Sequence, residues 1–488
     1  MTTLDAKIGW KFDNTYARLP EAILTKIKPI TVKNPEVILF NHQLSSELSL
    51  NFANMDNNVL ASIFSGNNLP SSSDCIAQAY AGHQFGHFTI LGDGRAIVIG
   101  EHLNKKNQRF DIQFKGSGKT PYSRHGDGRA ALGPMLREYI ISEAMHGLKI
   151  PTTRSLAVVK TGEEVIRETP LQGAILTRVA SSHIRVGTFQ YMAAMLNLRS
   201  FKILLNYTIK RHYPEIIDTK IPALELLKIV IKKQIDLVTN WMRVGFIHGV
   251  MNTDNTSVSG EAFDYGPCAF INTYKPETTY SSIDHNKRYS FGNQPKIIKW
   301  NISRFAETLL PIIHQNKEKS LQLAQSVIDN FDDLWNKKYY EMMLNKIGIK
   351  HNNNILHPLV DELLHFMEIF NKDYNNTFWS LSQDDFLKNT LMNNSAFIPW
   401  HKKWKKNLNK FSNMKKAQDL MKKNNPIIIP RNHLVEDAIE EAGNGNINSF
   451  QKLLHVISAP YQQQDNLDKF MKPPNSSFEE NFQTYCGT

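Results

Sequence analysis

Two short stretches of the first 120 residues have the hydrophobic pattern of strands. Residues 95–101 (RAIVIGE) and 109–118 (RFDIQFKGSG) are rich in β-branched and aromatic residues and are bounded by glycine-rich turns, which predicts two strands. In the second, Phe110, Ile112 and Phe114 share one face. The period of two then places Lys115 with Asp111 and Gln113 on the opposite face, so Lys115 is expected to point away from the apolar side.

A helical pattern follows at residues 133–148 (GPMLREYIISEAMHGL). Pro134 suits a first helical position, apolar residues recur with helical spacing, and Gly147 marks the end. Glu138 lies one turn inside this helix. Residues 173–178 (GAILTR) predict another strand, and Thr188 is a candidate N-cap for a helix over residues 189–198. A small mixed α/β region therefore fills about the first 190 residues.

The pattern becomes mainly helical from Pro222. Apolar residues recur every three or four positions up to Trp241, and Gly245 ends the predicted helix. Further helices are predicted over residues 298–313 and 319–347. Residues 265–295 have no clean period and contain many Pro, Gly and Asn residues, which is typical of a long surface loop near a functional site.

Composition narrows the class of protein without identifying it. The 488 residues, 41% of them hydrophobic, are enough for two or three packed lobes. A net charge of +11 favours anionic partners but does not choose among them. Cys75, Cys268 and Cys486 are too widely spaced for a disulfide framework or a thiolate zinc site. No apolar run suits a signal peptide or a membrane span, so we expect a cytoplasmic protein with no membrane partner.

A basic tract at residues 401–416 (HKKWKKNLNKFSNMKK) has two interpretations. Lysines interleaved with aromatic residues are one signature of RNA binding. The spacing of Trp404, Leu408, Phe411 and Lys415 fits a solvated helix whose aromatic residues pack inward. We favour the helix, and nucleic acid is not an expected partner.

Chemistry-bearing residues occur in an order known from protein-kinase-like phosphate chemistry. A strand Lys (Lys115), a helix Glu (Glu138), the pair Asp254–Asn255 and a following Asp-Tyr-Gly that begins at Asp264 succeed one another along the chain. Mg²⁺ prefers oxygen ligands, so Asn255 and Asp264 are candidate metal ligands. Asp254 is a candidate to accept the proton of an incoming hydroxyl. The purely structural alternatives are an Asx-capped turn at 254–255 and a surface ion pair between Lys115 and Glu138.

Other motifs carry weaker signals. Arg178 and Arg185 are suited to clamp phosphate oxygens, although arginines in connecting segments are usually solvated. Gly92 and Gly94 permit close approach of a phosphate or a ring, but a hairpin turn would use them equally well. His83 and His87 have a zinc-compatible helical spacing; the nearby glycines disfavour a helix and no third ligand is near, so we do not expect a metal there.

Several segments together resemble the selenoprotein O family of protein adenylyltransferases. They are FDNTYARLP (12–20), YAGHQFGHFTILGDGRA (80–96), residues 111–145, GFIHGVMNTDN (245–255), FDYGPCAF (263–270) and NNPIIIPRNHLVEDAI (424–439). The resemblance implies an α+β, protein-kinase-like bilobal fold with a smaller mixed α/β N-lobe, a mainly helical C-lobe and a helical extension. The expected boundaries are an N-terminal extension (1–80), the N-lobe (81–180), the C-lobe (181–330) and the C-terminal extension with its terminal Cys (331–488).

The resemblance also implies residue roles. Lys115 and Glu138 would form the ion pair, Asp254 would be the base, and Asn255 and Asp264 would hold Mg²⁺, with Mn²⁺ as an alternative. Nucleotide contacts would come from Gly92, Gly94, Arg95, Asp127, Gly128 and Asp264, with Arg178 and Arg185 on the phosphates. Cys486 stands where many family members have a terminal selenocysteine or cysteine, so a redox role, with Cys268 as its partner, is a hypothesis.

The activity that the resemblance implies is AMP transfer from ATP to Ser, Thr or Tyr hydroxyls of proteins, with release of pyrophosphate. The family binds ATP in reversed orientation, so AMP and not the γ-phosphoryl group is transferred. The expected partners are ATP and hydroxyl-bearing proteins, and we expect a monomer. The alternatives are a kinase-like enzyme that transfers the γ-phosphoryl group and an inactive nucleotide-binding scaffold associated with RNA through its basic surface.

Overall fold

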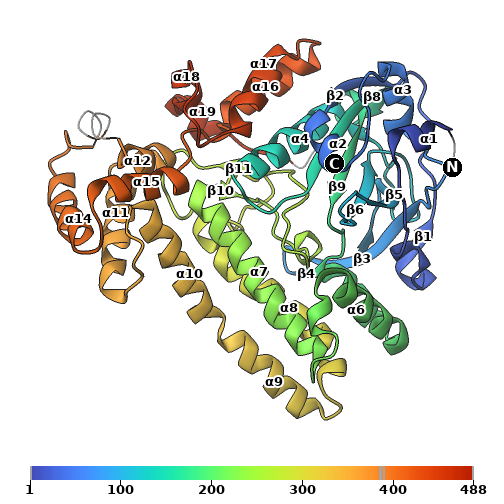
Figure 1. The fold of residues 1–488 in the computed structure, drawn as a ribbon, viewed down its shortest axis with the longest axis horizontal. Coiled ribbons are helices and arrows are strands. Elements are labelled where there is room, and N and C mark those ends of the chain that lie inside the picture. The colour runs from blue at the N-terminus through green and yellow to red at the C-terminus, as the bar shows by residue number, and fades with distance from the viewer. Residues whose placement is uncertain (1–2, 384–386, 388–390, 486–488) are drawn as a thin grey trace.

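The computed structural model describes residues 3–383, 387 and 391–485, and its first 180 residues build one antiparallel sheet (Figure 1). The strand order is β1-β3-β5-β6-β9-β8-β2, with β4 paired to β3 and β7 paired to β9. The strands are β1 (Leu24–Lys26), β2 (Glu36–Phe40), β3 (Ile76–Gln84), β4 (His87–Gly92), β5 (Ala96–Leu103), β6 (Arg109–Lys115), β7 (Ala130–Ala131), β8 (Arg154–Ile166) and β9 (Pro170–Ala180). The three predicted strands are found as β5, β6 and β9, and the mixed α+β class is confirmed.

Both faces of the sheet are buried. Val159 and Ile175 belong to one apolar cluster, whereas their neighbours Val158 and Leu176 belong to another, because successive strand residues face opposite sides. The first face is covered by three short helices, α1 (Thr3–Ile8), α2 (His42–Glu47) and α3 (Asn57–Phe64). The second face is covered by α4 (Leu132–Gly147). This helix begins two residues before Pro134, so the predicted first helical position is wrong, and it ends at Gly147 as expected.

Strand β6 has the alternation that its sequence predicts. Ile112 and Phe114 are fully buried against the first face. Asp111, Gln113 and Lys115 point the other way and are also buried. Lys115 therefore faces the second side of the sheet, where it contacts charged groups, and it does not face solvent.

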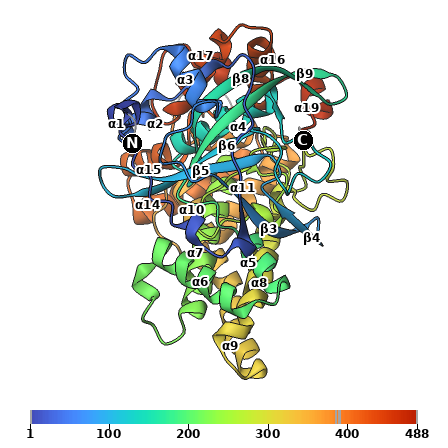
Figure 2. The ribbon, with the colours of Figure 1, turned by 90° about the vertical axis from the view of Figure 1, so that its right-hand side faces the viewer.

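The chain after residue 180 is mainly helical (Figures 1 and 2). The first group is α5 (Val186–Ala194), α6 (Leu198–His212), α7 (Pro222–Val244), α8 (Gln294–Ile313), α9 (Lys317–Asp329) and α10 (Phe331–Lys346). Helix α7 ends as predicted, with Gly245 in the left-handed conformation at φ 78°. The helix predicted over 319–347 is two helices that meet at Asn330.

The N-cap prediction for Thr188 is wrong. Helix α5 begins at Val186, and Arg185 is its N-cap. The Thr188 hydroxyl instead accepts a hydrogen bond from the Arg185 backbone N–H at 3.2 Å, which is the return bond of a capping box. The helix therefore starts three residues earlier than its apolar pattern indicates.

Further helices form the C-terminal part of the chain, with α11, α14 and α15 at one end of the molecule and α16 and α17 over α4 (Figure 1). They are α11 (His357–Ile369), α12 (Tyr374–Ser380), α14 (Phe397–Phe411), α15 (Met414–Asn424), α16 (Asn432–Gly443), α17 (Asn448–Ser458), α18 (Asp468–Met471) and α19 (Ser476–Asn481). An ion pair between Arg137 and Glu436 joins α4 to α16. No helix in the described residues has the length and apolar character to cross a membrane.

The basic tract is helical, as favoured, but it is not one helix, because α14 ends at Phe411 and α15 begins at Met414. Trp404 is buried, and its indole N–H donates to the Ile347 carbonyl at 2.8 Å. The inward packing expected of Phe411 is wrong, because its side chain is 45% exposed and stacks on His351.

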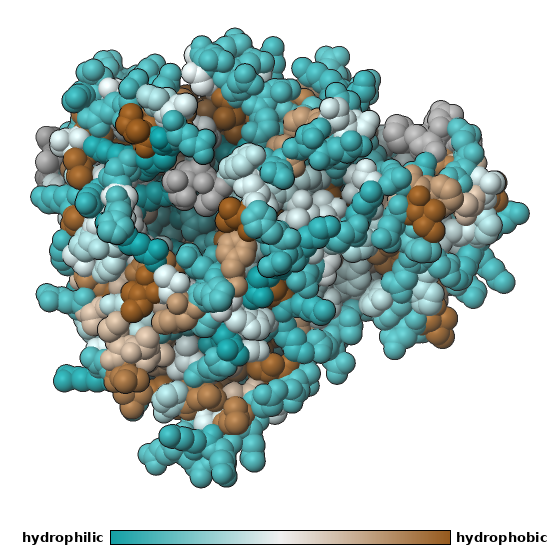
Figure 3. Space-filling view, turned by 180° about the vertical axis from the view of Figure 1, so that it is seen from behind, coloured by the Kyte–Doolittle hydropathy of each residue, from teal (hydrophilic) through white to brown (hydrophobic). Residues whose placement is uncertain are grey.

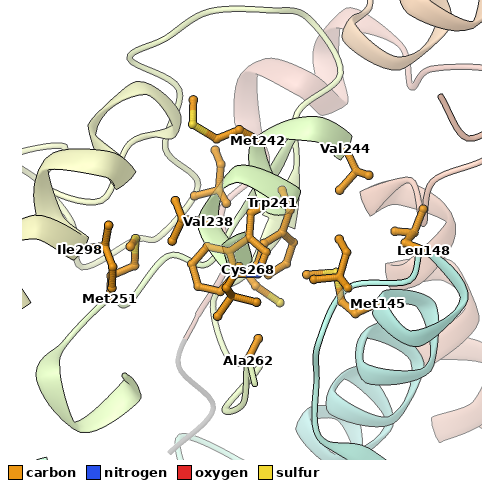
Figure 4. Packing of buried hydrophobic residues seen from close by; sticks show 14 of the residues in the cluster. Met145, Leu148, Val238, Trp241, Met242, Val244, Met251, Ala262, Cys268 and Ile298 are labelled. Atoms are coloured by element: carbon orange, nitrogen blue, oxygen red, sulfur yellow. The ribbon is translucent and has the colours of Figure 1, made fainter. Parts of the chain in front are cut away.

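The predicted long loop is found over residues 265–293, and its predicted end at 295 is wrong because α8 begins at Gln294. Its regular structure is the two-residue strand β11 (Ala269–Phe270), paired with β10 (Phe246–Ile247), and one 3₁₀ turn (Phe291–Asn293). The loop is packed and not merely draped over the surface: Cys268 lies in the apolar cluster around Trp241 and Met145 (Figure 4). This packing fixes the loop beside the sheet.

Candidate active site

A cavity of about 380 Å³ lies between the sheet and the loops that follow α7. The molecule is hollowed on the face that Figure 3 shows. The charged side chains that line the cavity are Arg95, Lys115, Arg129, Arg167, Arg178, Arg185, Asp93, Asp127, Asp254 and Asp264. Cations outnumber carboxylates, so the cavity suits an anionic ligand.

Four charged groups from distant parts of the sequence meet at the back of the cavity. Lys115 Nζ donates to Glu138 Oε2 at 2.6 Å and to Asp264 Oδ1 at 2.8 Å. Arg178 Nε donates to Glu138 Oε1 at 2.7 Å, and its Nη2 donates to Asp264 Oδ1 at 2.6 Å. The Lys115, Glu138 and Arg178 side chains are less than a tenth exposed, whereas Asp264 is 26% exposed toward the cavity. The structural alternative, a surface ion pair between Lys115 and Glu138, is therefore wrong, because the pair is buried.

The neighbouring cations keep both carboxylates of this cluster ionised. Burial by itself would raise the pKa of Asp264, but Arg178 and Lys115 outweigh it and hold the pKa well below its usual range. The pKa of Glu138 is lowered in the same way. Asp264 also has a left-handed backbone at φ 61°, which Asp tolerates better than most residues. Its carboxylate is thus a fixed negative charge facing the cavity.

Arg185 links the cluster to Asp254. Its guanidinium donates to the Asp254 carbonyl at 3.1 Å and lies 3.9 Å from both Asp93 Oδ1 and Asp264 Oδ2. The Tyr80 and Phe263 rings hold it, with Cζ 4.1 Å and 4.7 Å from the two ring centroids. The guanidinium is buried and preorganised, so it can meet an anionic ligand without first being ordered.

Asp254 lies in the 3₁₀ turn Thr253–Asn255 beneath β3. Its side chain packs against Gly82, and within the described residues its Oδ1 atom has no hydrogen-bond partner. Burial raises the pKa of Asp254 to about 6, although Arg185 opposes the shift. Oδ1 is shut off by Gly82, but Asp254 lines the cavity, so its carboxylate is placed to take a proton from a ligand on its other side.

Asn255 and Asp264 both line the cavity, and each has a side-chain oxygen of the kind that binds a divalent cation. The Asn255 amide donates to the Val250 carbonyl at 3.0 Å, which leaves its Oδ1 atom for a ligand. Lys115 and Arg178 engage Asp264 Oδ1, so Oδ2 is the less committed oxygen. The described residues contain no group of three His, Cys, Asp or Glu side chains that would hold a metal. Two oxygens fit Mg²⁺, which takes few protein ligands and completes its shell with phosphates and water.

The glycine-rich residues and their neighbours line the other end of the cavity. Gly92, Gly94, Arg95, Asp127 and Gly128 are all among the lining residues. A side chain at Gly92 would collide with the Tyr122 ring, since a Cβ there would lie 2.3 Å from it. The absence of a side chain at Gly92 therefore lets the Tyr122 ring pack against it. A simple hairpin turn would not need this contact.

Four residues singled out in the sequence lie away from the cavity or outside the described residues: Cys268, Cys486, His83 and His87. Cys268 is buried, and burial raises the pKa of its thiol to about 12, so it is a protonated core residue. Cys486 lies outside the described residues, and its pairing with Cys268 stays a hypothesis. His83 and His87 lie on the two strands of the β3–β4 hairpin, so the helical arrangement considered for them from their spacing is not formed.

Sequence reasoning missed several residues that line the cavity. Asp93 is buried between the two glycines, and its Oδ2 atom accepts from the Gln78 N–H at 3.0 Å. Its place in the motif LGDG was the available signal. Arg167 grips Asp127 with two hydrogen bonds, at 2.9 Å and 3.2 Å. No local pattern points to Arg167, because its role comes from the β8–β9 hairpin that carries it to the cavity.

The charges and geometry of this cavity suit a polyanion, and its Asp254, Asn255 and Asp264 side chains have the chemistry to receive a proton and to hold a divalent cation. The family model described as protein adenylyltransferase SelO matches residues 7–458. The chain is 54% identical over 482 residues to the protein nucleotidyltransferase YdiU of Pelagibacter ubique, covering 99% of this chain and 100% of the relative.

Other relatives are similar over equally long stretches. Proteins of the same name from Nitrosococcus oceani and Bacillus cereus (strain B4264) are 51% and 50% identical, over 483 and 488 residues. These matches cover 99% and 100% of this chain, and 98% and 100% of the relatives. The chain belongs to the SelO family, as its motifs indicated.

Proposed function

We propose that this protein is a protein adenylyltransferase that transfers AMP from ATP to hydroxyl groups of proteins. The observation that carries the proposal is the meeting of Lys115, Glu138, Arg178 and Asp264 in a cationic cavity beside Asp254. Membership of the SelO family supports AMP as the transferred group, since the family is described as protein adenylyltransferase. The name of the relatives, protein nucleotidyltransferase, supports a protein as the acceptor.

The proposed fold is the bilobal arrangement of protein kinases. The N-lobe would hold the sheet and α4, and the C-lobe would hold the helices from α5 onward. The ion pair from a strand Lys to a helix Glu supports this, because kinases use the same pair to place phosphates. Because β1, β2 and the start of β3 belong to the sheet, the N-lobe would begin before residue 81. We keep residue 180 as its end and residues 181–330 as the core of the C-lobe, with the later helices as its extension.

The proposed phosphate site uses the cations of the cavity. Lys115, Arg178 and Arg185 would face the triphosphate, where fixed positive charge stabilises the charge that grows on the α-phosphoryl group in the transition state. Gly92, Gly94, Arg95, Asp127 and Gly128 would contact the nucleotide from the other end of the cavity. A rigid cluster is favourable because it needs no reorganisation during the reaction.

The proposed base is Asp254. Its carboxylate would take the proton from a Ser, Thr or Tyr hydroxyl, whose oxygen then attacks the α-phosphorus of ATP. The bond from the α-phosphorus to the bridging oxygen breaks, and pyrophosphate leaves with that electron pair. A pKa of about 6 leaves Asp254 mostly ionised at neutral pH while keeping it basic enough to accept a proton.

Asn255 and Asp264 would hold the divalent cation, with Mg²⁺ as the proposed ion and Mn²⁺ as a substitute. The bound cation would supply positive charge against the phosphate oxygens. The Asn255 Oδ1 atom and the less engaged Oδ2 atom of Asp264 support this assignment.

The test is a mass-spectrometric search for AMP on the protein itself and on proteins of a cell lysate, after incubation with ATP and Mg²⁺. We expect AMP-bearing Ser, Thr or Tyr residues with the unmodified sequence and none with Asp264→Ala. A folded Asp264→Ala protein that modifies the same sites equally well would contradict the proposal.

A further inference from the structure

Two arginines stack on one tryptophan beside the cavity, and the proposed transfer step does not use them. Arg288 Cζ lies 4.9 Å from the Trp300 ring centroid, and Arg304 Cζ lies 5.2 Å from it. Both distances are within the range of cation–π attraction. Arg288 belongs to the loop before α8, and Trp300 and Arg304 lie one turn apart on α8. We call these three residues the Arg288 stack.

The Arg288 stack reaches the candidate base through a short series of contacts. The Trp300 ring meets the His83 ring edge-on, with 5.2 Å between centroids. The His83 backbone N–H donates to the Thr253 hydroxyl at 2.7 Å, and Thr253 directly precedes Asp254. His83 and Thr253 therefore lie between the stack and Asp254 in this series of contacts.

A second series of contacts places the stack at the rim of the cavity. The Tyr289 hydroxyl donates to Asn252 Oδ1 at 2.6 Å, and Asn252 lines the cavity. The Arg288 guanidinium also lies against the β3–β4 turn, 3.9 Å from where a Cβ of Gly86 would stand. Arg288 does not line the cavity itself but lies beside Asn252 and the β3–β4 turn, whose Gln84 also lines the cavity.

The positive charge of Arg288 is not balanced locally. Arg304 pairs with Glu307 at 2.6 Å. Asp284 is occupied by the backbone N–H groups of Arg288 and Tyr289, both at 2.8 Å. Across the described residues, the Arg288 side chain has no carboxylate within ion-pair distance, and its buried Nε atom lacks a hydrogen-bond partner. The exposed Lys287 adds positive charge in the same loop.

We infer that the Arg288 stack binds a carboxylate of the protein substrate and thereby favours hydroxyl residues that lie near Asp or Glu. The inference rests on the proposed function and adds the chemical class of its protein substrate. A guanidinium can donate two parallel hydrogen bonds to a carboxylate. Stacking on the Trp300 ring already restricts the guanidinium, so binding costs less conformational entropy. The charge complementarity points to an acidic segment and against a basic one.

The test compares peptides that share a central Ser, Thr or Tyr and differ in their flanking residues. One set carries Asp and Glu, the second Asn and Gln, and the third Lys, and each is incubated with the full-length protein, Mg²⁺ and ATP labelled at the α-phosphorus. We expect the acidic set to be modified with a kcat/KM about tenfold above the neutral set, mainly through KM. The difference should shrink as ionic strength rises.

Two variants of Arg288 and one control separate the inference from a folding defect. Arg288→Gln should lose the preference for acidic flanks, and Arg288→Glu should transfer it to the Lys set, a gain that misfolding cannot produce. Arg199→Gln, which removes an exposed arginine on α6, should behave as the unmodified protein. The same comparison applies to the sites found in a cell lysate, where Asp and Glu should be enriched around the modified residue, and Arg288→Gln should remove the enrichment.

The outcomes distinguish failure of the inference from failure of the proposed function. If the unmodified sequence transfers AMP to no peptide, to no lysate protein and not to itself, the proposed function fails. If it transfers AMP with equal efficiency to acidic and neutral sets, or if Arg288→Gln keeps the preference, the inference is overturned and the proposed function stands.

Discussion

The carboxylate of Asp254 packs so closely on the backbone of Gly82 that a Cβ at position 82 would lie 2.1 Å from Asp254 Oδ1. Strand β3 thus forms a wall against the candidate base, and the side of Asp254 that faces the cavity is the one a ligand can reach. The pair couples the sheet to the 3₁₀ turn that holds the candidate base.

Gly82→Ala should therefore disable transfer without preventing nucleotide binding. The added methyl group must push Asp254 out of place, and misplacement by about 1 Å of a reacting group costs on the order of 100-fold in rate. The measurement is the rate of AMP transfer together with ATP affinity. Gly443→Ala is the matched control, because nothing lies within 4 Å of a Cβ there. A Gly82→Ala protein with unchanged rate would show that the contact with Gly82 does not position the base.

The pH dependence of transfer should report the ionisation of Asp254. The base must be deprotonated, and burial raises its pKa to about 6, so the rate should fall as pH drops through about 6 and level off above about 7. The measurement is kcat/KM for AMP transfer from pH 5 to 8, with melting temperatures to confirm that the protein stays folded. A rate that is flat down to pH 5 would exclude Asp254 as the titrating base.

Asp254→Asn should abolish transfer and stabilise the fold at neutral pH. The folded-state pKa of Asp254 lies above its ordinary value of 3.8, so ionisation costs stability, and this cost is absent below pH 3.8 and complete above about pH 6. Removing it should raise the free energy of unfolding by about 1–3 kcal/mol at pH 7.5. The measurement is denaturant unfolding at pH 7.5 and at pH 4, where the gain should be much smaller.

Glu138→Gln should destabilise the protein far more than loss of a surface pair. The change leaves Lys115 and Arg178 with Asp264 as their carboxylate partner, and breaking a buried pair costs about 3–5 kcal/mol. Asp74→Asn breaks the half-exposed pair with Lys26 and should cost less than about 1 kcal/mol. Urea unfolding of both variants measures the difference, and equal losses would mean that the buried cluster is not a structural unit.

Removal of divalent cations should stop transfer reversibly. Chelation by EDTA should abolish labelling, and added Mg²⁺ or Mn²⁺ should restore it in the unmodified protein. Asp264→Asn should stay inactive after the metal is returned, since it lacks the negative charge that holds the cation. Full activity in EDTA would remove Asn255 and Asp264 from the proposed metal site.

The order of residues along the chain predicts much of the candidate site. Lys115, Glu138, Asp254 and Asp264 stand out because the types and succession of these residues suit phosphate chemistry, and the structure brings all four to one cavity or its back wall. Periodicity also predicts the correct facing of β6 and the end of α7 at Gly245.

Contacts between distant segments account for what the sequence does not predict. The packing of Gly82 on Asp254 joins residues far apart in the sequence, and Arg167 reaches the cavity through a hairpin whose register no local pattern encodes. Helix α5 begins early because Arg185, fixed between the Tyr80 and Phe263 rings, sets its first turn. Phe411 lies at an apolar position of its helix, but its ring stacks on His351 and does not pack in the core.

The most direct test of the central claim follows the two ends of the triphosphate in one reaction. The protein is incubated with Mg²⁺ and ATP labelled at the α-phosphorus or, in a parallel sample, at the γ-phosphorus, and label on protein is counted. AMP transfer predicts protein-bound label from the α-position and release of the γ-label as pyrophosphate. Protein-bound label from the γ-position, with none from the α-position, would contradict it and make the protein a phosphotransferase.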